Sequence, residues 1–444
     1  MASTYLSRTP SSNGSDTIAT FSAWLKKTAN GSYEGVFTSY SSTSEYFEIN
    51  FESGDSLEVR AKVSNSYVLR KITNRKFRDN SAFYHIVVAI DTTDSTEEDR
   101  CKIYVNGTRE TSFSTNTNPS SSQDLNFNTT SHEHRVGRDE WSTPAYFDGV
   151  MAHVHWIDGT VYQASTFGET DSTSGIWKPK TAPSVTYGTN GFFLKFENSG
   201  AMGTDSSGNS NTFTVGGGTL TQNVDTPTNN FATLNPLAGN CTFSNGNNTW
   251  VGTTSGYEHS SATLGVSSGK WYWEVKPTHA CGAMGITDFN WQFDRRGSLI
   301  YASSGYAWVY EGNGYVSHNS YGDIASNYSS YGSSDIIGVA LDLTNNKLHF
   351  SKNGVFEASS NPATNTNGIS IDAPSSLPSG FYSPLVADLC SATAGGGSVN
   401  FGSGFFGTTA VASANADANG HGKMEYAVPS GYYTLNTKNI KEFG

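Results

Sequence analysis

The sequence predicts an all-β protein built from two antiparallel, jelly-roll-like β-sandwiches in tandem. Residues 335–354 carry the clearest signal, because two short apolar runs flank the turn formers Asn345-Asn346 and a second turn, Asn353-Gly354, follows at once. Asn and Gly tolerate the positive φ angles of hairpin turns, so this stretch is typical of a β-meander. Aromatic residues make up 13% of a composition otherwise rich in Gly, Ser, Thr and Asn, which favours folded strands over disorder.

The first predicted domain covers residues 1–180. Polar residues take every second position in several short strand candidates, and long helical periodicity is absent. Such alternation gives a strand one buried face and one solvated face. Asn106-Gly107 is a strong hairpin signal between two of the candidates. The pattern predicts a two-sheet sandwich. Its strand candidates are residues 21–25, 34–37, 46–51, 56–60, 84–90 and 102–105.

Most of residues 15–160 resemble the concanavalin A-like sandwiches of the laminin-G type. The motifs that carry the resemblance are Phe21-Ser-Ala-Trp-Leu-Lys26, Phe83-Tyr-His-Ile-Val-Val88, Ile103-Tyr-Val-Asn-Gly107 and Phe147-Asp-Gly-Val-Met-Ala-His-Val154. The family usually has Trp where this chain has Phe83, which is a change within the aromatic class. The resemblance implies a sandwich fold that often holds a calcium ion at its rim.

Residues 181–235 connect the two predicted domains, either as a linker or as a hairpin docked on the first sandwich. The segment Asp205-Ser-Ser-Gly-Asn209 also occurs in laminin-G-like proteins. Asp205 and Asn209 offer the oxygen atoms that Ca²⁺ prefers, which makes them candidate ligands of a structural calcium ion. The same residues equally describe a tight Asx turn that needs no ion, and no other cofactor is expected.

Residues 236–405 form the second predicted domain, which resembles SPRY domains. Gly269-Lys-Trp-Tyr-Trp-Glu-Val275, the meander at 335–354 and Val399-Asn-Phe-Gly402 occur in the order that this family shows. The resemblance implies a β-sandwich that binds partners through variable loops and carries no known chemistry. Residues 406–444 form a C-terminal tail, which we expect to lie across the sandwich or to pass to a neighbouring chain.

Charge and hydropathy exclude several functional classes. The net charge is −12, and the one basic run, Arg70–Arg78, is too short for a duplex-binding face, so nucleic acid is not an expected partner. No apolar run approaches the roughly 18 residues that a membrane-spanning helix needs, and the N-terminus lacks the apolar core of a secretion signal. We therefore expect neither membrane insertion nor signal-dependent export.

The four cysteines, Cys101, Cys241, Cys281 and Cys390, are widely spaced and form no Cys-x-x-Cys pair. Oxidation would allow three pairings, but the spacing and the missing export signal favour free, buried thiols.

An enzymatic alternative rests on Glu48-Ile-Asn-Phe-Glu52. On a strand, Glu48, Asn50 and Glu52 share one face, and laminarinase-like glycosidases carry a Glu-x-Asp-x-Glu strand in their cleft. Retaining hydrolysis needs two carboxyl groups about 5–5.5 Å apart. The middle acid of that motif is Asn50 here, so we interpret the three residues as the solvated face of an alternating strand.

Histidine pairs raise the question of zinc. His132 with His134, and His153 with His155, would share a face on a strand, but neither pair has a Cys or a third His at ligand spacing. Polar positions on sandwich strands explain both pairs better than a metal site.

A loop-rich stretch of the second domain is the candidate binding surface. Exposed Tyr and Trp rings stack on the apolar faces of sugars, while neighbouring Asn, Asp and Ser bond to the hydroxyl groups. Local packing, or packing against a neighbouring subunit, is an equally weighted alternative. The candidate ligand-binding residues are Tyr301, Tyr306, Trp308, Tyr310, Tyr315 and Tyr321.

A laminin-G-like unit joined to a SPRY-like unit resembles structural proteins of marine tailed bacteriophages. The resemblance implies a non-enzymatic virion protein on a tail fibre, tail appendage or capsid surface, made in the bacterial cytoplasm and released by lysis, which needs no disulfides. Its expected partners are other virion proteins, further copies of itself and a host-surface glycan or protein. Two alternatives stay open, a purely structural decoration or cement protein and a glycan hydrolase using Glu48 and Glu52.

Overall fold

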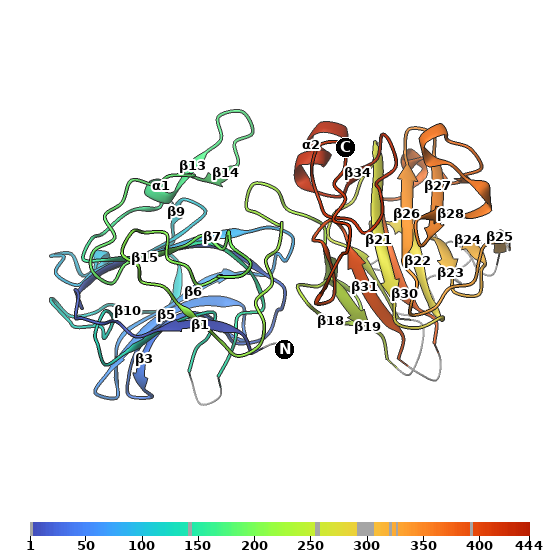
Figure 1. Cartoon of the computed structure of the whole chain (residues 1–444). Coiled ribbons are helices and arrows are strands. Elements are labelled where there is room, and N and C mark those ends of the chain that lie inside the picture. Colours follow the sequence, from blue (N-terminus) through green and yellow to red (C-terminus); the bar gives the residue numbers. More distant parts are fainter. Residues whose placement is uncertain are drawn as a thin grey trace. The chain divides into compact units, whose positions relative to one another are not determined.

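The computed structural model of the chain describes residues 3–140, 144–253, 258–290, 306–318, 322–325, 327–390 and 394–444, without the side chains of 322 and 323. The chain forms two compact units. The first domain extends to Gln222 and includes Thr226–Thr228, and the second domain comprises Asn223–Asp225 and Asn229–Gly444. Both consist mainly of antiparallel sheets (Figure 1), which confirms the predicted all-β class.

The first domain has an eight-stranded sheet in the order β10-β6-β5-β4-β3-β11-β1-β16 and a six-stranded sheet in the order β15-β12-β2-β7-β8-β9. The eight-stranded sheet contains β1 (Tyr5–Arg8), β3 (Glu34–Ser42), β4 (Glu45–Phe51), β5 (Ser56–Val63), β6 (Ser66–Lys76), β10 (Phe113–Thr117), β11 (Glu133–Val136) and β16 (Thr214–Gly216). The six-stranded sheet contains β2 (Ile18–Lys27), β7 (Tyr84–Asp91), β8 (Cys101–Val105), β9 (Thr108–Arg109), β12 (Gly149–Asp158) and β15 (Phe192–Leu194). Helix α1 (Ala164–Phe167), a 3₁₀ turn (Glu97–Asp99) and the ribbon of β13 (Gly168–Thr170) and β14 (Trp177–Pro179) complete the domain.

The core of the first domain lies between these sheets. Ile49 and Phe51 of β4 point into it and are fully buried, as the alternation of their strand predicts. Trp156 of β12 stacks on Phe37 of β3 at 4.6 Å between ring centroids, and its indole N–H donates to Asn128 Oδ1 at 2.7 Å. A buried Trp thus joins the two sheets with its one polar atom satisfied.

The structure decides between the two interpretations of the connector. Strand β15 pairs with β12, and β16 pairs with β1, so residues up to Gln222 are built into both sheets of the first domain. Residues 181–222 are therefore part of the first sandwich, residues 229–235 belong to the second unit, and the domain boundary lies near 222–229.

Within its described residues, the second domain has a seven-stranded sheet in the order β17-β20-β30-β22-β23-β24-β25 and a nine-stranded sheet in which β18-β19-β31-β21-β26-β27-β28 form the main path. The seven-stranded sheet contains β17 (Leu234–Gly239), β20 (Glu258–Ala262), β22 (Gly282–Asp288), β23 (Trp308–Glu311), β24 (Val316–His318), β25 (Gly322–Ala325) and β30 (Tyr382–Asp388). The nine-stranded sheet contains β18 (Thr242–Ser244), β19 (Thr249–Val251), β21 (Lys270–Pro277), β26 (Ile337–Asp342), β27 (Lys347–Lys352), β28 (Val355–Phe356), β29 (Ile369–Ser370), β31 (Gly396–Asn400) and β34 (Tyr433–Thr434). A small ribbon joins β32 (Phe405–Phe406) to β33 (Thr409–Ala410), and α2 (Thr437–Phe443) ends the chain.

The predicted meander forms as β26, β27 and β28. Asn346 and Asn353 have φ angles of 53° and 50°, and Gly354 has a φ angle of 80°, so the turn residues take the left-handed conformations that they were expected to supply. None of the described helices is long and apolar enough to cross a membrane.

The C-terminal tail lies across the nine-stranded sheet of its own domain. Trp271 and Trp273 of β21 are both buried in the core between the sheets, while Tyr272 points to the opposite face. There Tyr272 packs in a buried cluster with Met424 and Tyr432 of the tail. Strand β34 extends the cover by pairing in parallel with β21. The tail thus covers the outer face of this sheet and forms a second packed layer on it.

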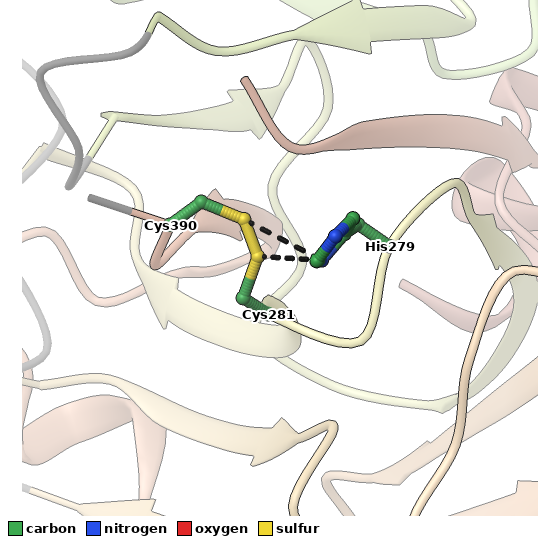
Figure 2. A group of neighbouring side chains, drawn as sticks. All are labelled: His279, Cys281 and Cys390. Atoms are coloured by element: carbon green, nitrogen blue, oxygen red, sulfur yellow. Dashed lines mark hydrogen bonds between the residues drawn. A yellow bond between two sulfur atoms is a disulfide. The ribbon is translucent and has the colours of Figure 1, made fainter. Parts of the chain in front are cut away.

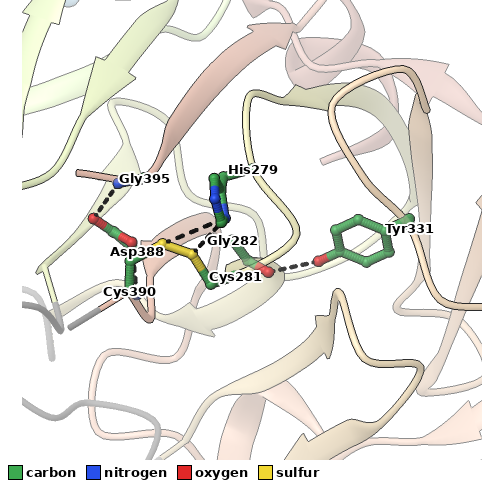
Figure 3. Close-up of a disulfide and its surroundings, with 7 residues drawn as sticks. All are labelled: His279, Cys281, Gly282, Tyr331, Asp388, Cys390 and Gly395. Carbon is green, nitrogen blue, oxygen red and sulfur yellow. Dashed lines mark hydrogen bonds between the residues drawn. A yellow bond between two sulfur atoms is a disulfide. The ribbon is translucent and has the colours of Figure 1, made fainter. Parts of the chain in front are cut away.

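The expectation of four free thiols is wrong for one pair. Cys281 precedes β22 and Cys390 follows β30, and these two strands pair with Gly282 opposite Asp388. Their Cα atoms lie 5.4 Å apart, and the two residues form a disulfide (Figure 3). Cys101 and Cys241 remain free, the first buried and the second half-buried.

Candidate functional site

The outward face of β4 and β5 carries a buried charged cluster of Glu48, Asn50, Glu58 and Arg60. The Arg60 side chain, 1% exposed, donates to Glu48 Oε2 through Nε at 2.7 Å. In the same ion-pair cluster its Nη2 lies 2.5 Å from Glu48 Oε2 and its Nη1 lies 3.2 Å from Glu58 Oε2. Asn50 donates to Glu58 at 3.4 Å. Glu48 and Asn50 are 1% and 0% exposed, so the interpretation of this face as solvated is wrong.

A segment from beyond β11 lies on this face. The Thr38 hydroxyl donates to the Arg138 carbonyl at 2.8 Å, and the Glu140 N–H approaches Glu48 Oε1 at 3.5 Å. A Cβ atom added to Gly35 of β3 would lie 2.0 Å from the backbone nitrogen of Asp139, so only glycine permits this close approach. Long-range packing therefore covers a strand face whose local pattern predicts exposure.

The electrostatics of the cluster oppose an acid–base role for Glu48. Burial raises its pKa, and the Arg60 guanidinium acts against that rise. Burial lowers the pKa of Arg60, but Glu48, Glu58 and Tyr46 together act against this, so the pKa of Arg60 lies above its ordinary value. Glu52 lies just beyond β4, and its Oε1 is 3.9 Å from Arg70 Nη2. A carboxylate held by a buried guanidinium cannot reach a glycosidic bond without breaking that ion pair.

A second buried acid sits at the start of β3. Glu34 is 1% exposed, and its Oε1 lies 3.4 Å from Lys27 Nζ. Burial raises the pKa of Glu34 to about 8; Lys27 acts against the rise and Asp148 adds to it. The folded protein therefore keeps a proton that the unfolded chain releases near pH 4.5.

This difference predicts a pH-dependent stability. Because the folded pKa lies above the unfolded value, the contribution of Glu34 falls as pH rises from about 4.5 to about 8. Glutamine has no proton to lose, so Glu34→Gln should not show this fall. We expect the unfolding free energy of the variant minus that of the wild-type protein to be more positive at pH 8.5 than at pH 5, by on the order of 2–4 kcal/mol. Calorimetry of both proteins at both pH values measures this, and an equal offset at the two pH values would contradict it.

The predicted loop aromatics divide into three groups. Tyr301 and Tyr321 lie outside the described residues. Trp308 and Tyr310 belong to β23 and are buried in the core, so their assignment to a binding surface is wrong. Both side chains point inward because i and i+2 share one face of a strand. The half-buried Tyr306 packs against the same core, and Tyr315 is 38% exposed, as a ligand-binding ring requires.

Tyr315 lies on the hairpin between β23 and β24. Its backbone N–H donates to Asn313 Oδ1 at 3.0 Å, and the Asn313 amide donates to Glu311 Oε2 at 3.4 Å. The Ser317 hydroxyl donates to Glu311 Oε1 at 2.5 Å. An exposed ring thus stands beside an exposed amide and a positioned carboxylate, the groups that bind sugar faces and hydroxyls.

Asp205 organises the loop that follows β15. Its Oδ1 accepts from the N–H groups of Phe193 and Ser207 at 2.9 and 2.8 Å, and its Oδ2 accepts from Asn211 N–H and the Ser207 hydroxyl, both at 2.8 Å. The Asn209 amide donates to two backbone carbonyls at 2.6 and 2.9 Å. These bonds suffice to hold the turn. Calcium binding by Asp205 and Asn209 stays a prediction.

The histidine pairs do not form metal sites among the described residues. His134 is buried among core aromatics, and burial lowers its pKa to about 3. His155 stacks on Phe193 at 3.9 Å between ring centroids and bonds the Tyr187 hydroxyl at 2.9 Å. These contacts place both rings in packing roles.

Within the described residues, the one group of at least three His, Cys, Asp or Glu residues arranged to hold a metal ion is His279, Cys281 and Cys390 (Figure 2). The sequence did not indicate this group because Cys390 lies 109 residues from Cys281 along the chain. His279 Nδ1 lies 2.9 Å from Cys281 Sγ and 3.7 Å from Cys390 Sγ. The His279 ring is exposed, Cys281 is half-buried and Cys390 is buried.

Comparisons with known proteins bear on the two domains separately. Residues 2–165 match the laminin-G-type family model described as the concanavalin A-like lectin/glucanases superfamily. No curated protein matches the sequence.

Several solved structures are similar to parts of the chain. The SPRY domain of human HERC1 shares 19% identity, with coverage of 37% of this chain and 94% of that domain and a TM-score of 0.28. A heptameric SAP-like pentraxin from Limulus polyphemus shares 12% identity, covering 36% of this chain and 72% of that chain with a TM-score of 0.27. The PSpry domain of TRIM65 shares 14% identity, covering 38% of this chain and 91% of that domain with a TM-score of 0.27. SPRY domains are thus among the solved structures that are similar to parts of the chain, and residues 2–165 are similar to the laminin-G type of the concanavalin A-like superfamily.

Proposed function

We propose that this chain is a non-enzymatic binding protein on the surface of a tailed-phage virion, where it contacts a host-surface glycan or protein. The observation that carries the binding role is the β23–β24 hairpin, which presents the Tyr315 ring beside Asn313 and Glu311. Separately from this hairpin, residues 2–165 of the first domain match a superfamily named for lectins and glucanases, which supports carbohydrate as a ligand class for that domain. The burial of Glu48 under its Arg60 ion pair favours binding over hydrolysis.

Tyr315→Ala tests the binding role. We expect the variant to lose roughly five- to a hundredfold of its affinity for host cells or their surface polysaccharide, because truncation of an aromatic side chain at a binding contact costs about 1–3 kcal/mol. Cell pull-down and surface plasmon resonance on immobilised polysaccharide measure the change. Phe381→Ala is the matched control, since Phe381 is an exposed aromatic (45%) elsewhere in the same domain.

Equal binding by the wild-type protein and Tyr315→Ala would show that the hairpin is not the contact site. If the wild-type protein also fails to bind cells, the decoration or cement role becomes the better proposal.

Immunogold labelling tests the virion assignment. Antibody against this chain should decorate purified phage particles, at the tail or its fibres for host recognition and evenly over the head for decoration. Bare particles with free protein in the lysate would contradict the virion role.

A further inference from the structure

We propose that His279, Cys281 and Cys390 form a redox-gated site for a soft divalent cation such as Zn²⁺. In the disulfide form the site is closed, and in the dithiol form it binds the cation. All three ligand atoms, His279 Nδ1 and the two sulfurs, lie within 4.8 Å of one another (Figure 2). Two thiolates and an imidazole are ligands that suit zinc better than they suit hard cations such as Ca²⁺ or Mg²⁺.

The geometry agrees with a tetrahedral ion once the disulfide is reduced. Ligands at about 2.1–2.3 Å from zinc lie roughly 3.5–4 Å from each other. The distance from His279 Nδ1 to Cys390 Sγ, 3.7 Å, already falls in this range, and the 2.9 Å distance to Cys281 Sγ needs only a small movement. After reduction the sulfurs separate to make room for the ion, and water takes the fourth position.

The backbone holds both cysteines in place independently of the bond between their sulfurs. Leu389 N–H donates to the Cys281 carbonyl at 2.9 Å, directly beside the β22–β30 pairing. The buried Asp388 carboxylate accepts from the N–H groups of Cys390 and Gly395, each at 2.8 Å (Figure 3). The backbone of both cysteines should therefore keep its position when the disulfide is reduced, so that only the side chains have to move apart to admit the ion.

His279 lies on the turn that leads into β22. The Gly282 N–H approaches the His279 carbonyl at 3.4 Å, and the buried Tyr331 hydroxyl donates to the Gly282 carbonyl at 2.8 Å. This turn brings the exposed ring against the sulfurs while leaving it open to solvent. A cation or a small thiol reagent can therefore approach from the His279 side.

The gate is a thiol–disulfide exchange. A low-molecular-weight disulfide is the oxidant: the two thiolates give up two electrons and join as one S–S bond, and the small disulfide takes these electrons with two protons and leaves as two thiols. The cation loses two of its ligands and departs. In a reducing cytoplasm the site would be open to metal, and outside the cell it would be closed.

The test uses the full chain, reduced with a phosphine, and Co²⁺ as a spectroscopic probe. We expect one equivalent of Co²⁺ to give a thiolate-to-cobalt charge-transfer band that Zn²⁺ displaces. Glutathione disulfide should abolish the band and release the metal. Cys281→Ser and Cys390→Ser should lose the band, and Cys241→Ser, at a free cysteine of the same domain, should keep it.

His279→Ala separates ligation from folding, because the ring is exposed and its loss leaves the core intact. We expect this variant to retain the disulfide but to bind Co²⁺ at least about tenfold more weakly. A reduced wild-type protein without the band, or a band that survives in the Cys281→Ser and Cys390→Ser variants, would overturn the site. Unchanged affinity in His279→Ala would overturn its three-ligand composition.

Discussion

Replacing Arg60 by Ala should cost the first domain about 3–5 kcal/mol of unfolding free energy. The guanidinium is 1% exposed and contacts Glu48 and Glu58, which are 1% and 0% exposed. Removing it leaves the buried Glu48 carboxylate without a counter-ion, while Glu58 keeps Arg70, whose Nε lies 2.8 Å from its Oε1. The desolvation of Glu48 is then uncompensated, which destabilises far more than the loss of an exposed ion pair.

Arg75→Ala is the matched control. Arg75 Nε lies 2.8 Å from Glu110 Oε2 in the same domain, but the Arg75 side chain is 50% exposed, so we expect a change within about 1 kcal/mol. Urea unfolding of the full chain, followed by calorimetry to separate the two domains, measures both variants. Equal small losses would show that Glu48 is solvated, and the hydrolase alternative would then deserve a direct assay for released reducing ends.

The parts of the fold that local sequence encodes were predicted correctly. Ile49 and Phe51 are buried because a strand alternates its faces, and Asn346 and Asn353 form turns because they accept positive φ. These signals need no knowledge of distant residues.

The fate of the charged cluster depends on packing that the strand pattern does not contain. Glu48 pairs in register with Arg60, a complementary pair that could have indicated a buried ion pair. The segment at Arg138–Glu140 that lies over it comes from about 90 residues further along the chain, as the separation of 92 between Glu48 and Glu140 shows. Local alternation alone therefore predicted the wrong environment.

The site at His279 was missed for the same reason. Cys281 and Cys390 are 109 residues apart, and only the pairing of β22 with β30 brings them together. Trp308 and Tyr310 were predicted to lie on an exposed loop, but Trp308-Val-Tyr310 belongs to a strand, and both rings face the core. Composition indicated an aromatic-rich region but not which rings face solvent.

Glu274→Ala should release the C-terminal tail and cost the second domain about 3–5 kcal/mol. Glu274 of β21 is fully buried, and its oxygens accept from the N–H groups of Glu425 and Tyr426, each at 2.8 Å. The Tyr272 hydroxyl and the Asn400 amide donate to it at 3.2 and 3.4 Å. Truncation leaves these four donors without their acceptor inside a packed layer.

Glu274→Gln should lose less, because it keeps one acceptor oxygen while placing an amide N–H₂ against the remaining donors. Burial raises the pKa of Glu274 to about 7, so its stability contribution falls as pH rises from about 4.5 to about 7, and Glu274→Gln should remove that dependence. Glu442→Ala, at an exposed carboxylate of the tail, is the control and should change stability by less than about 0.5 kcal/mol.

Limited proteolysis shows whether the tail is the element released, because cleavage requires local opening of the chain. In Glu274→Ala we expect new cleavage around Glu425 and Tyr426. The end of the tail has its own attachment, since β34 pairs with β21 and the Ala232 N–H donates to the Leu435 carbonyl at 3.0 Å. Cleavage confined to the first region would show two independent attachments, whereas cleavage extending through α2 would show that the tail docks as one cooperative unit. Protection of both regions, equal to that of the wild-type protein, would contradict the role of Glu274 in holding the tail.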